Sequence, residues 1–146
     1  MIKKFAAIAV ATCIPFFAQA EVWKDYTPSE EVTEVVMVAV QPNYVDDYLM
    51  QIETTWVKSM EVQKEMGIVV DYAVWASNSA ESPNVYLTTT YKNMGAMQGS
   101  EERYDAVNAA LKKMGMDEDE NEKTAKGYEN MREMVGYTVM RQITYK

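Results

Sequence analysis

The sequence predicts one α+β domain in which helices cover one face of an antiparallel four-stranded sheet. Three observations favour this class. An amphipathic stretch over residues 43–67 has apolar residues at helical three- and four-residue spacing. Strand-like segments over 34–41 and 68–77 lie directly before and after it. A strictly alternating segment over 135–145 ends the chain.

The first 20 residues are predicted to be a secretory signal peptide. Lys3 and Lys4 precede an apolar run over 5–17, and Ala18-Gln19-Ala20 has the small residues of a cleavage site. The run is shorter than the roughly 20 residues that a membrane-spanning helix needs. We therefore expect a periplasmic or secreted mature chain that begins near Glu21 and has no membrane association after cleavage.

Composition restricts the chemistry. The chain has 14 basic and 22 acidic residues, so no nucleic-acid partner is expected, because phosphate contacts need clustered Lys and Arg. It has no histidine, which excludes His-based catalytic triads, His metal sites and haem with an axial His. The one cysteine, Cys13, lies in the leader, so the mature chain forms no disulfide. In the alternative, Cys13 is a lipid-modified terminus, although Thr12 stands where Gly or Ala is usual.

The elements of the first half follow from local signals. Residues 21–33 form an extended N-terminal segment whose aromatic side chains must pack on something. Pro42 ends the first strand, Asn43 is expected to cap the long helix, and Gly67 supplies its left-handed stop.

In the second half, residues 78–83 have turn composition between the second strand and a third strand over 84–92. A loop over 92–99 leads to Ser100, which signals a helix start, and Gly115 closes that helix. The acidic run 117–122 is expected to be a solvated loop, and residues 123–134 are expected to form a loop or a helix broken around Gly127. The order is then β-α-β-β-α-β over residues 34–146, the split βαβ or ferredoxin-like plan.

Such a sheet has one face without helices, which must be polar, ligand-covered or paired with a second subunit. Strand parity separates the two faces. The helix side is nearly pure aliphatic: Val36, Val38, Val40, Val70, Val74, Val85, Leu87, Val135 and Val139. The other side is aromatic and hydroxyl-rich, like the lining of a cavity: Met37, Ala39, Asp71, Ala73, Trp75, Tyr86, Thr88, Thr90, Thr138, Met140 and Gln142.

The element order, the junction Gln41-Pro42-Asn43 and the second-strand motif Val70-Asp71-Tyr72-Ala73-Val74-Trp75 resemble the dimeric α/β-barrel superfamily over residues 34–146. That superfamily includes the antibiotic-biosynthesis monooxygenases, related stress-response proteins and secreted bacterial members without an assigned activity. The resemblance implies two sheets that close into a barrel across a two-fold axis, with a small apolar ligand in each subunit. The chain departs from the haem-degrading members, because it has no histidine ligand.

Asp71 and Tyr86 are the candidate catalytic residues. Asp71 is a mid-strand carboxylate on the mixed face, and burial beside Trp75 would raise its pKa and make it a general base. The alternative is a solvated or Lys-paired aspartate near a strand end. Arg141 is expected either to neutralise an anionic ligand or to reach solvent from the core edge.

The candidate ligand-binding residues form an aromatic, hydroxyl and thioether wall: Met37, Trp75, Thr88, Thr90, Met140, Gln142 and Arg141. The alternative is plain dimer-interface packing, where such residues are enriched. No metal or cofactor is expected. Paired methionines without His or Cys favour packing over copper(I), and the run 117–122 lacks the glycine of a calcium loop at its sixth position.

The sequence therefore predicts an exported homodimer that binds a small apolar or aromatic molecule or serves a stress response without catalysis. Two alternatives stay open. One is a cofactor-independent monooxygenase in which Asp71 or Tyr86 deprotonates a phenolic substrate. The other is a purely structural dimer.

Overall fold

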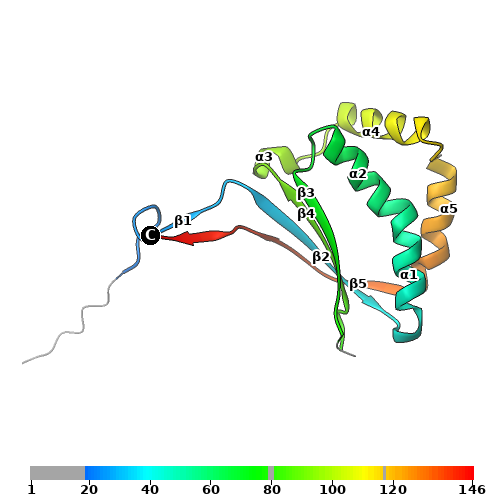
Figure 1. Ribbon diagram of the computed structural model, residues 1–146, viewed down its shortest axis with the longest axis horizontal. Coiled ribbons are helices and arrows are strands. Elements are labelled where there is room, and N and C mark those ends of the chain that lie inside the picture. The colour runs from blue at the N-terminus through cyan, green and yellow to red at the C-terminus, as the bar shows by residue number, and fades with distance from the viewer. Residues whose placement is uncertain (1–18, 79–80, 117) are drawn as a thin grey trace, which may run out of the picture.

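The computed structural model describes residues 19–78, 81–116 and 118–146, and shows an α+β chain with helices on one face of an antiparallel sheet (Figure 1). The predicted leader falls mainly on residues 1–18, outside the described residues. The strands are β1 (Tyr26–Pro28), β2 (Val32–Val40), β3 (Asp71–Ala76), β4 (Val85–Tyr91), β5 (Arg132–Met140) and β6 (Ile143–Tyr145). The helices are α1 (Val45–Ile52), α2 (Lys58–Glu65), α3 (Met94–Met97), α4 (Glu101–Lys113) and α5 (Glu118–Glu129). Among the described residues, no helix is both long and apolar enough to span a bilayer.

The main sheet has the order β3-β4-β2-β5, and every neighbouring pair is antiparallel. The first and third of its strands along the chain therefore lie in the centre. This arrangement is compatible with the predicted β-α-β-β-α-β plan. Strands β1 and β6 form a second, two-stranded sheet.

The long helix is one helical segment from a 3₁₀ turn at Pro42–Tyr44 through α1, a π-helical stretch at Glu53–Val57 and α2. The prediction that Asn43 caps it is wrong, because Pro42 already begins the 3₁₀ turn and no side-chain cap hydrogen bond forms there. Gly67 has a φ of 71°, so the predicted left-handed stop is confirmed.

The core lies between this helix and the sheet, in two clusters. One joins Val38 and Val85 of the central strands to Tyr48 and Ile52 of α1 and to Tyr128 of α5. The other is made of Val32, Met60, Val69 and Tyr91. The aliphatic helix side is therefore confirmed for the central strands. Val70 is an exception, because it precedes β3 and is exposed while Val69 is buried.

Strand β5 does not alternate as predicted. Met37 pairs with Gly136 and Val38 with Met134, so Val135 is the extra residue of a β-bulge and is exposed. The bulge reverses the parity on its two sides, which is why Val135 does not join Val139 on the helix side. The predicted strand 135–145 is also two strands, because β5 ends at Met140.

The second helical region contains a correction as well. Ser100 caps α4, accepting a hydrogen bond from the Arg103 backbone N–H at 3.2 Å, and Gly115 has a φ of 81°, as predicted. Residues 118–129, expected to be a loop or a broken helix, form the continuous helix α5 through Gly127. Burial of Tyr128 in the core outweighs the poor helix propensity of that glycine.

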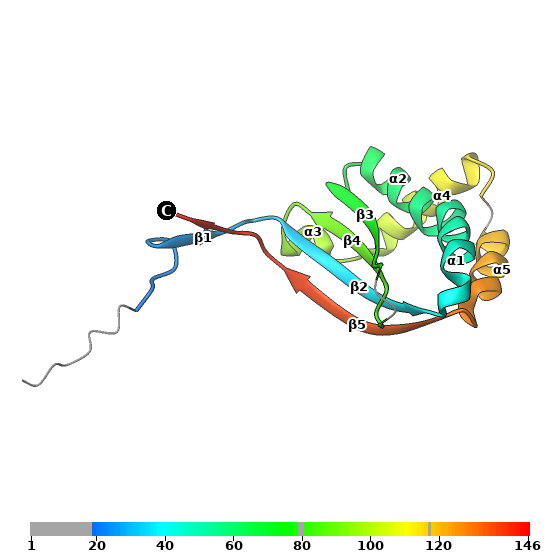
Figure 2. The same ribbon diagram turned by 60° about the horizontal axis from the view of Figure 1, so that its bottom comes forward.

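Strands β1 and β6 form an arm that extends away from the domain beyond β2 and β5 (Figures 1 and 2). Ser29 donates its backbone N–H to the Gln142 carbonyl at 2.8 Å, and the Lys146 ammonium donates to the Trp23 carbonyl. The predicted extended N-terminal segment is thus one half of this arm. Two aromatic side chains of the arm are exposed to solvent: Trp23 is 62% exposed and Tyr145 is 81% exposed.

Candidate functional site

The face of the main sheet that carries no helix, called the open face below, collects most of the predicted site residues. Side chains paired across antiparallel strands point to the same face. One cross-strand row contains Trp75, Tyr86, Met37 and Gly136. The next row contains Ala73, Thr88, Val35 and Thr138, and a third contains Asp71, Thr90, Thr33 and Met140.

Several polar side chains of the open face are bonded to one another or to backbone. Trp75 Nε1 donates to Thr88 Oγ1 at 3.3 Å, and that hydroxyl donates to the Ala73 carbonyl at 3.3 Å. The Thr33 and Thr90 hydroxyls lie 3.0 Å apart. The ring of Trp75 is nevertheless 61% exposed, and Met140 is also exposed. The face therefore offers apolar contact area, and the hydrogen-bonding groups of Trp75, Tyr86, Thr88, Thr33 and Thr90 on it are already paired.

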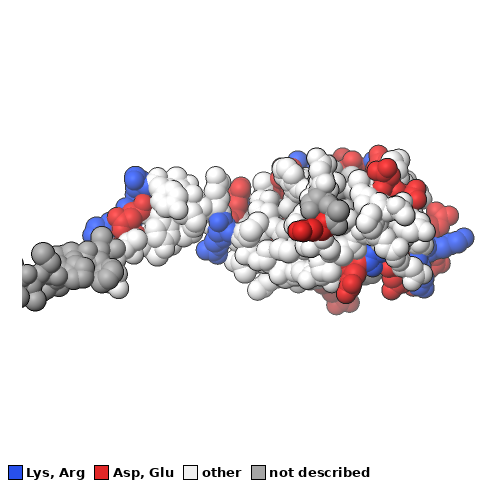
Figure 3. Space-filling view, turned by 90° about the horizontal axis from the view of Figure 1, so that it is seen from below, with Lys and Arg blue, Asp and Glu red and all other residues white. Residues whose placement is uncertain are grey.

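Charge is sparse over this side of the molecule. Figure 3 shows the molecule from below: Lys, Arg, Asp and Glu gather toward the end that carries the helices and again on the arm and its base, and the broad area between them is mostly other residues, with one acidic group near its centre. In the three rows above, Asp71 on the edge strand β3 is the charged residue, and Glu133 of β5, which pairs with Ala39, adds a second carboxylate beyond them. Water-exposed surfaces usually carry more charge than this, so the open face is suited to being covered.

Asp71 does not have the surroundings expected of a general base. Its carboxylate is exposed and lies 2.7 Å from the Lys64 ammonium. That hydrogen bond, together with one from the Tyr72 backbone, lowers the pKa of Asp71. The expected raised pKa is therefore wrong, because Asp71 opens an edge strand where α2 places a lysine beside it. The Lys-paired alternative is the one observed.

Tyr86 is half-buried on the open face, and its hydroxyl donates to the Pro83 carbonyl at 3.2 Å. Its cross-strand partners are Met37 and Trp75, neither of which accepts a proton from a phenol. The structure therefore brings Tyr86 to the predicted face, where neither of its two cross-strand partners is a base.

Arg141 and Gln142 are not part of the open face. Both are exposed and lie between β5 and β6, where the Gln142 carbonyl holds the base of the arm through Ser29. The predicted alternation had placed Gln142 beside Met140. It does not do so because pairing with β2 ends at Met140.

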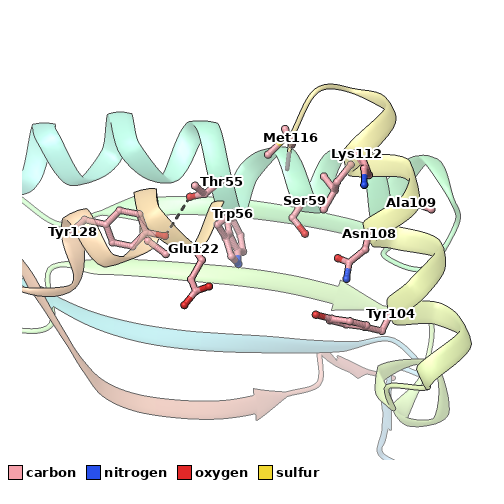
Figure 4. Close-up of a pocket in the computed structure, with 12 residues that line it drawn as sticks. Thr55, Trp56, Ser59, Tyr104, Asn108, Ala109, Lys112, Met116, Glu122 and Tyr128 are labelled. Carbon is pink, nitrogen blue, oxygen red and sulfur yellow. Dashed lines mark hydrogen bonds between the residues drawn. The ribbon is translucent and has the colours of Figure 1, made fainter. Parts of the chain in front are cut away.

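A second site, which the sequence did not indicate, lies on the other side of the sheet. A cavity of about 590 Å³ opens between the long helix, α4 and α5 (Figure 4). Its lining comes from three helical segments and the α4–α5 connection: Thr55, Trp56, Ser59, Tyr104, Asn108, Ala109, Leu111, Lys112, Met116, Glu122, Ala125 and Tyr128. The sequence prediction missed this cavity, because it gave the α5 region a loop or a broken helix and so did not place a continuous helix beside α4.

Neither site resembles a metal centre. Within residues 19–78, 81–116 and 118–146, no three His, Cys, Asp or Glu side chains are grouped so as to hold a metal ion. The acidic run predicted as a solvated loop instead contributes, from Glu118 onward, the first turns of α5.

Comparison with known proteins does not assign the chain to a family. No protein-family model matches the chain, and no curated protein matches it. Among solved structures, the chain is similar to the crystal structure of a conserved protein from Methanosarcina mazei Go1, with 18% identity over 80% of this chain and 92% of that chain and a TM-score of 0.40. A similarity of this size carries no information about function.

Proposed function

We propose that the chain is a ferredoxin-like subunit that dimerises through its open face, and that the two sheets enclose a small apolar or aromatic molecule as in a dimeric α/β barrel. The observation that supports this most directly is the exposed side chain of Trp75 on a sheet face with few charged residues, where the indole N–H already donates to Thr88. Left in water, such a face costs free energy that a second copy removes.

The area of the face bears on how the dimer forms. With strands about 4.8 Å apart and residues about 3.3 Å apart along each strand, a four-stranded face seven residues long projects roughly 440 Å². A stable interface usually buries about 800 Å² on each partner. The sheet face alone therefore falls short, even allowing for the relief of its side chains. The projecting arm supplies further apolar area, and we place it against the partner subunit.

The rows of the open face suggest where a ligand would lie. One row has short side chains: Ala73, Thr88, Val35 and Thr138. The adjacent row has the longer side chains of Trp75, Tyr86 and Met37, so the short row forms a furrow beside it. A flat apolar molecule fits in this furrow, with its face on the indole. We propose ligand binding, in a stress response or otherwise, rather than catalysis, because Asp71 is paired with Lys64 and lacks the raised pKa expected of a general base.

Light scattering of the purified full-length gene product, expressed with its leader, tests the dimer. We expect a dimer at micromolar concentration, a monomer for Trp75→Glu, and a dimer for the control Met50→Glu. Met50 is also exposed, at 64%, but lies on α1. A folded monomer of the parent chain would refute the proposal.

Two mass measurements complete the test. Native mass spectrometry that finds a small molecule in the parent dimer and not in the Trp75→Glu variant supports ligand binding, whereas an empty, packed dimer supports the purely structural alternative.

We also propose export to the periplasm or beyond. The intact mass of protein recovered from the periplasm or medium should then lack residues 1–20, and an unprocessed chain would contradict it.

A further inference from the structure

We propose that the cavity between the long helix, α4 and α5 is a second binding site, for a small aromatic carboxylate. This site is independent of the open face. It lies among the helices, on the opposite side of the sheet from Trp75, and none of its lining residues belongs to the main sheet. A volume of about 590 Å³ falls within the usual range for small-molecule sites, roughly 300–1,000 Å³.

The π-helical stretch Glu53–Val57 builds one wall. π-helical turns inside α-helices are rare and occur frequently at functional sites. Here Thr55 and Trp56 of that stretch both line the cavity. The Thr55 hydroxyl also lies 3.2 Å from the Tyr128 hydroxyl, which joins the π-helical wall to α5 (Figure 4). The irregular turn is therefore held in place by contacts across the cavity's edge.

The lining supplies aromatic and aliphatic surface on several sides. Trp56 points from the long helix toward the sheet, and Tyr104 extends from α4 on the opposite side of the hollow (Figure 4). Leu111 is buried, and Met116 is half-buried. Two aromatic side chains in one lining favour a flat apolar ring over a branched or strongly hydrated ligand.

The charge of the ligand follows from α4. Asn108 and Lys112 are four residues apart, so they lie on the same face of the helix, and both line the cavity. Neither side chain makes a hydrogen bond or ion pair within the part of the chain that the structure describes. Glu122, the carboxylate of the lining, is already paired with Lys126 at 2.6 Å. The unmatched groups are thus a cation and an amide, which together suit a carboxylate.

Calorimetric titration of the full chain with 1-naphthoate tests the site, with the uncharged methyl ester of 1-naphthoate as a comparison ligand. We expect saturable binding of naphthoate, at least tenfold weaker binding of the ester, and a loss of at least tenfold in Lys112→Gln. The control Lys113→Gln should bind like the parent, because Lys113 is exposed on the same helix but does not line the cavity.

A second pair of variants tests the location. Ala109→Trp should fill the cavity and abolish binding, whereas Ala106→Trp, at an exposed α4 position outside the lining, should not. If Ala109→Trp does not fold, the comparison of Lys112→Gln with Lys113→Gln still tests the proposal. Binding unchanged in Trp75→Glu separates this site from the open face. Absence of naphthoate binding at millimolar concentration, or equal losses in Lys112→Gln and Lys113→Gln, would overturn the proposal.

Discussion

Asn84 holds together the ends of the two central strands, and its removal should be costly. Its side chain is only 7% exposed. Its Oδ1 accepts a hydrogen bond from the Val40 backbone N–H at 2.8 Å, and its Nδ2 donates to the Val40 carbonyl at 2.8 Å. Asn84→Ala leaves both backbone groups of a buried residue without partners. Since each buried, unsatisfied polar group costs about 1–3 kcal/mol and two are left, we expect a loss of about 2–6 kcal/mol.

Urea unfolding followed by circular dichroism measures this loss. Such a change is a large part of the usual free energy of unfolding of about 5–15 kcal/mol, and it should lower the midpoint without changing the m-value. The matched control is Asn93→Ala. Asn93 also bonds a backbone N–H, that of Ala96 at 2.9 Å, but it does so on the surface, where a lost helix cap costs about 1 kcal/mol. Equal losses in the two variants would show that burial does not set the cost and would refute the reasoning.

The remaining predictions concern Tyr91 and two glycines. Burial, and then the negative charge of Glu34, raise the pKa of Tyr91 to about 12. Between about pH 10 and 12 the unfolded chain loses this proton and the native chain keeps it, so stability falls by about 2–3 kcal/mol as the pH rises. Denaturation at pH 9 and pH 11.5 should show a smaller fall in Tyr91→Phe than in the parent, where Tyr48 and Tyr137, whose pKa values burial also raises, account for the remainder; equal slopes would contradict it. In thermal melts, Gly127→Ala should stabilise by about 0.5–1 kcal/mol, because an added Cβ lies 3.5 Å from Gln51 Oε1 in a helix interior. Gly67→Ala should destabilise by about 1–2 kcal/mol, because its φ is 71°; a common sign for both glycine variants would be inconsistent with this explanation.

Strand parity predicted which residues share the open face, and the structure shows where that prediction was right and where it was wrong. Period-two alternation placed Met37, Trp75 and Tyr86 on one face, and the register confirms it, because β3 and β4 pair with their neighbours without irregularity. The same reasoning failed for Val135, since a bulge inserts one residue and reverses the parity. A bulge leaves no clear mark in a sequence.

The prediction of a raised pKa for Asp71 was wrong for a different reason. The sequence indicates that a carboxylate lies in the strand, but its pKa depends on what stands beside it. Lys64 is seven residues away on another element, and only the packing of α2 against the sheet edge brings the two within 2.7 Å. A pair that joins two different elements cannot be predicted from the spacing of its residues in the sequence.

The sequence by itself determined the element order, the long amphipathic helix, its stop at Gly67 and the two-faced sheet, because these depend on residues near one another in the chain. Only the tertiary structure decided the continuity of α5, the projecting arm and the cavity between the helices. Each of those depends on contacts between distant segments, such as Tyr128 with Thr55 and β1 with β6. Long-range packing overrides local propensity, and in this chain that packing forms the second candidate site.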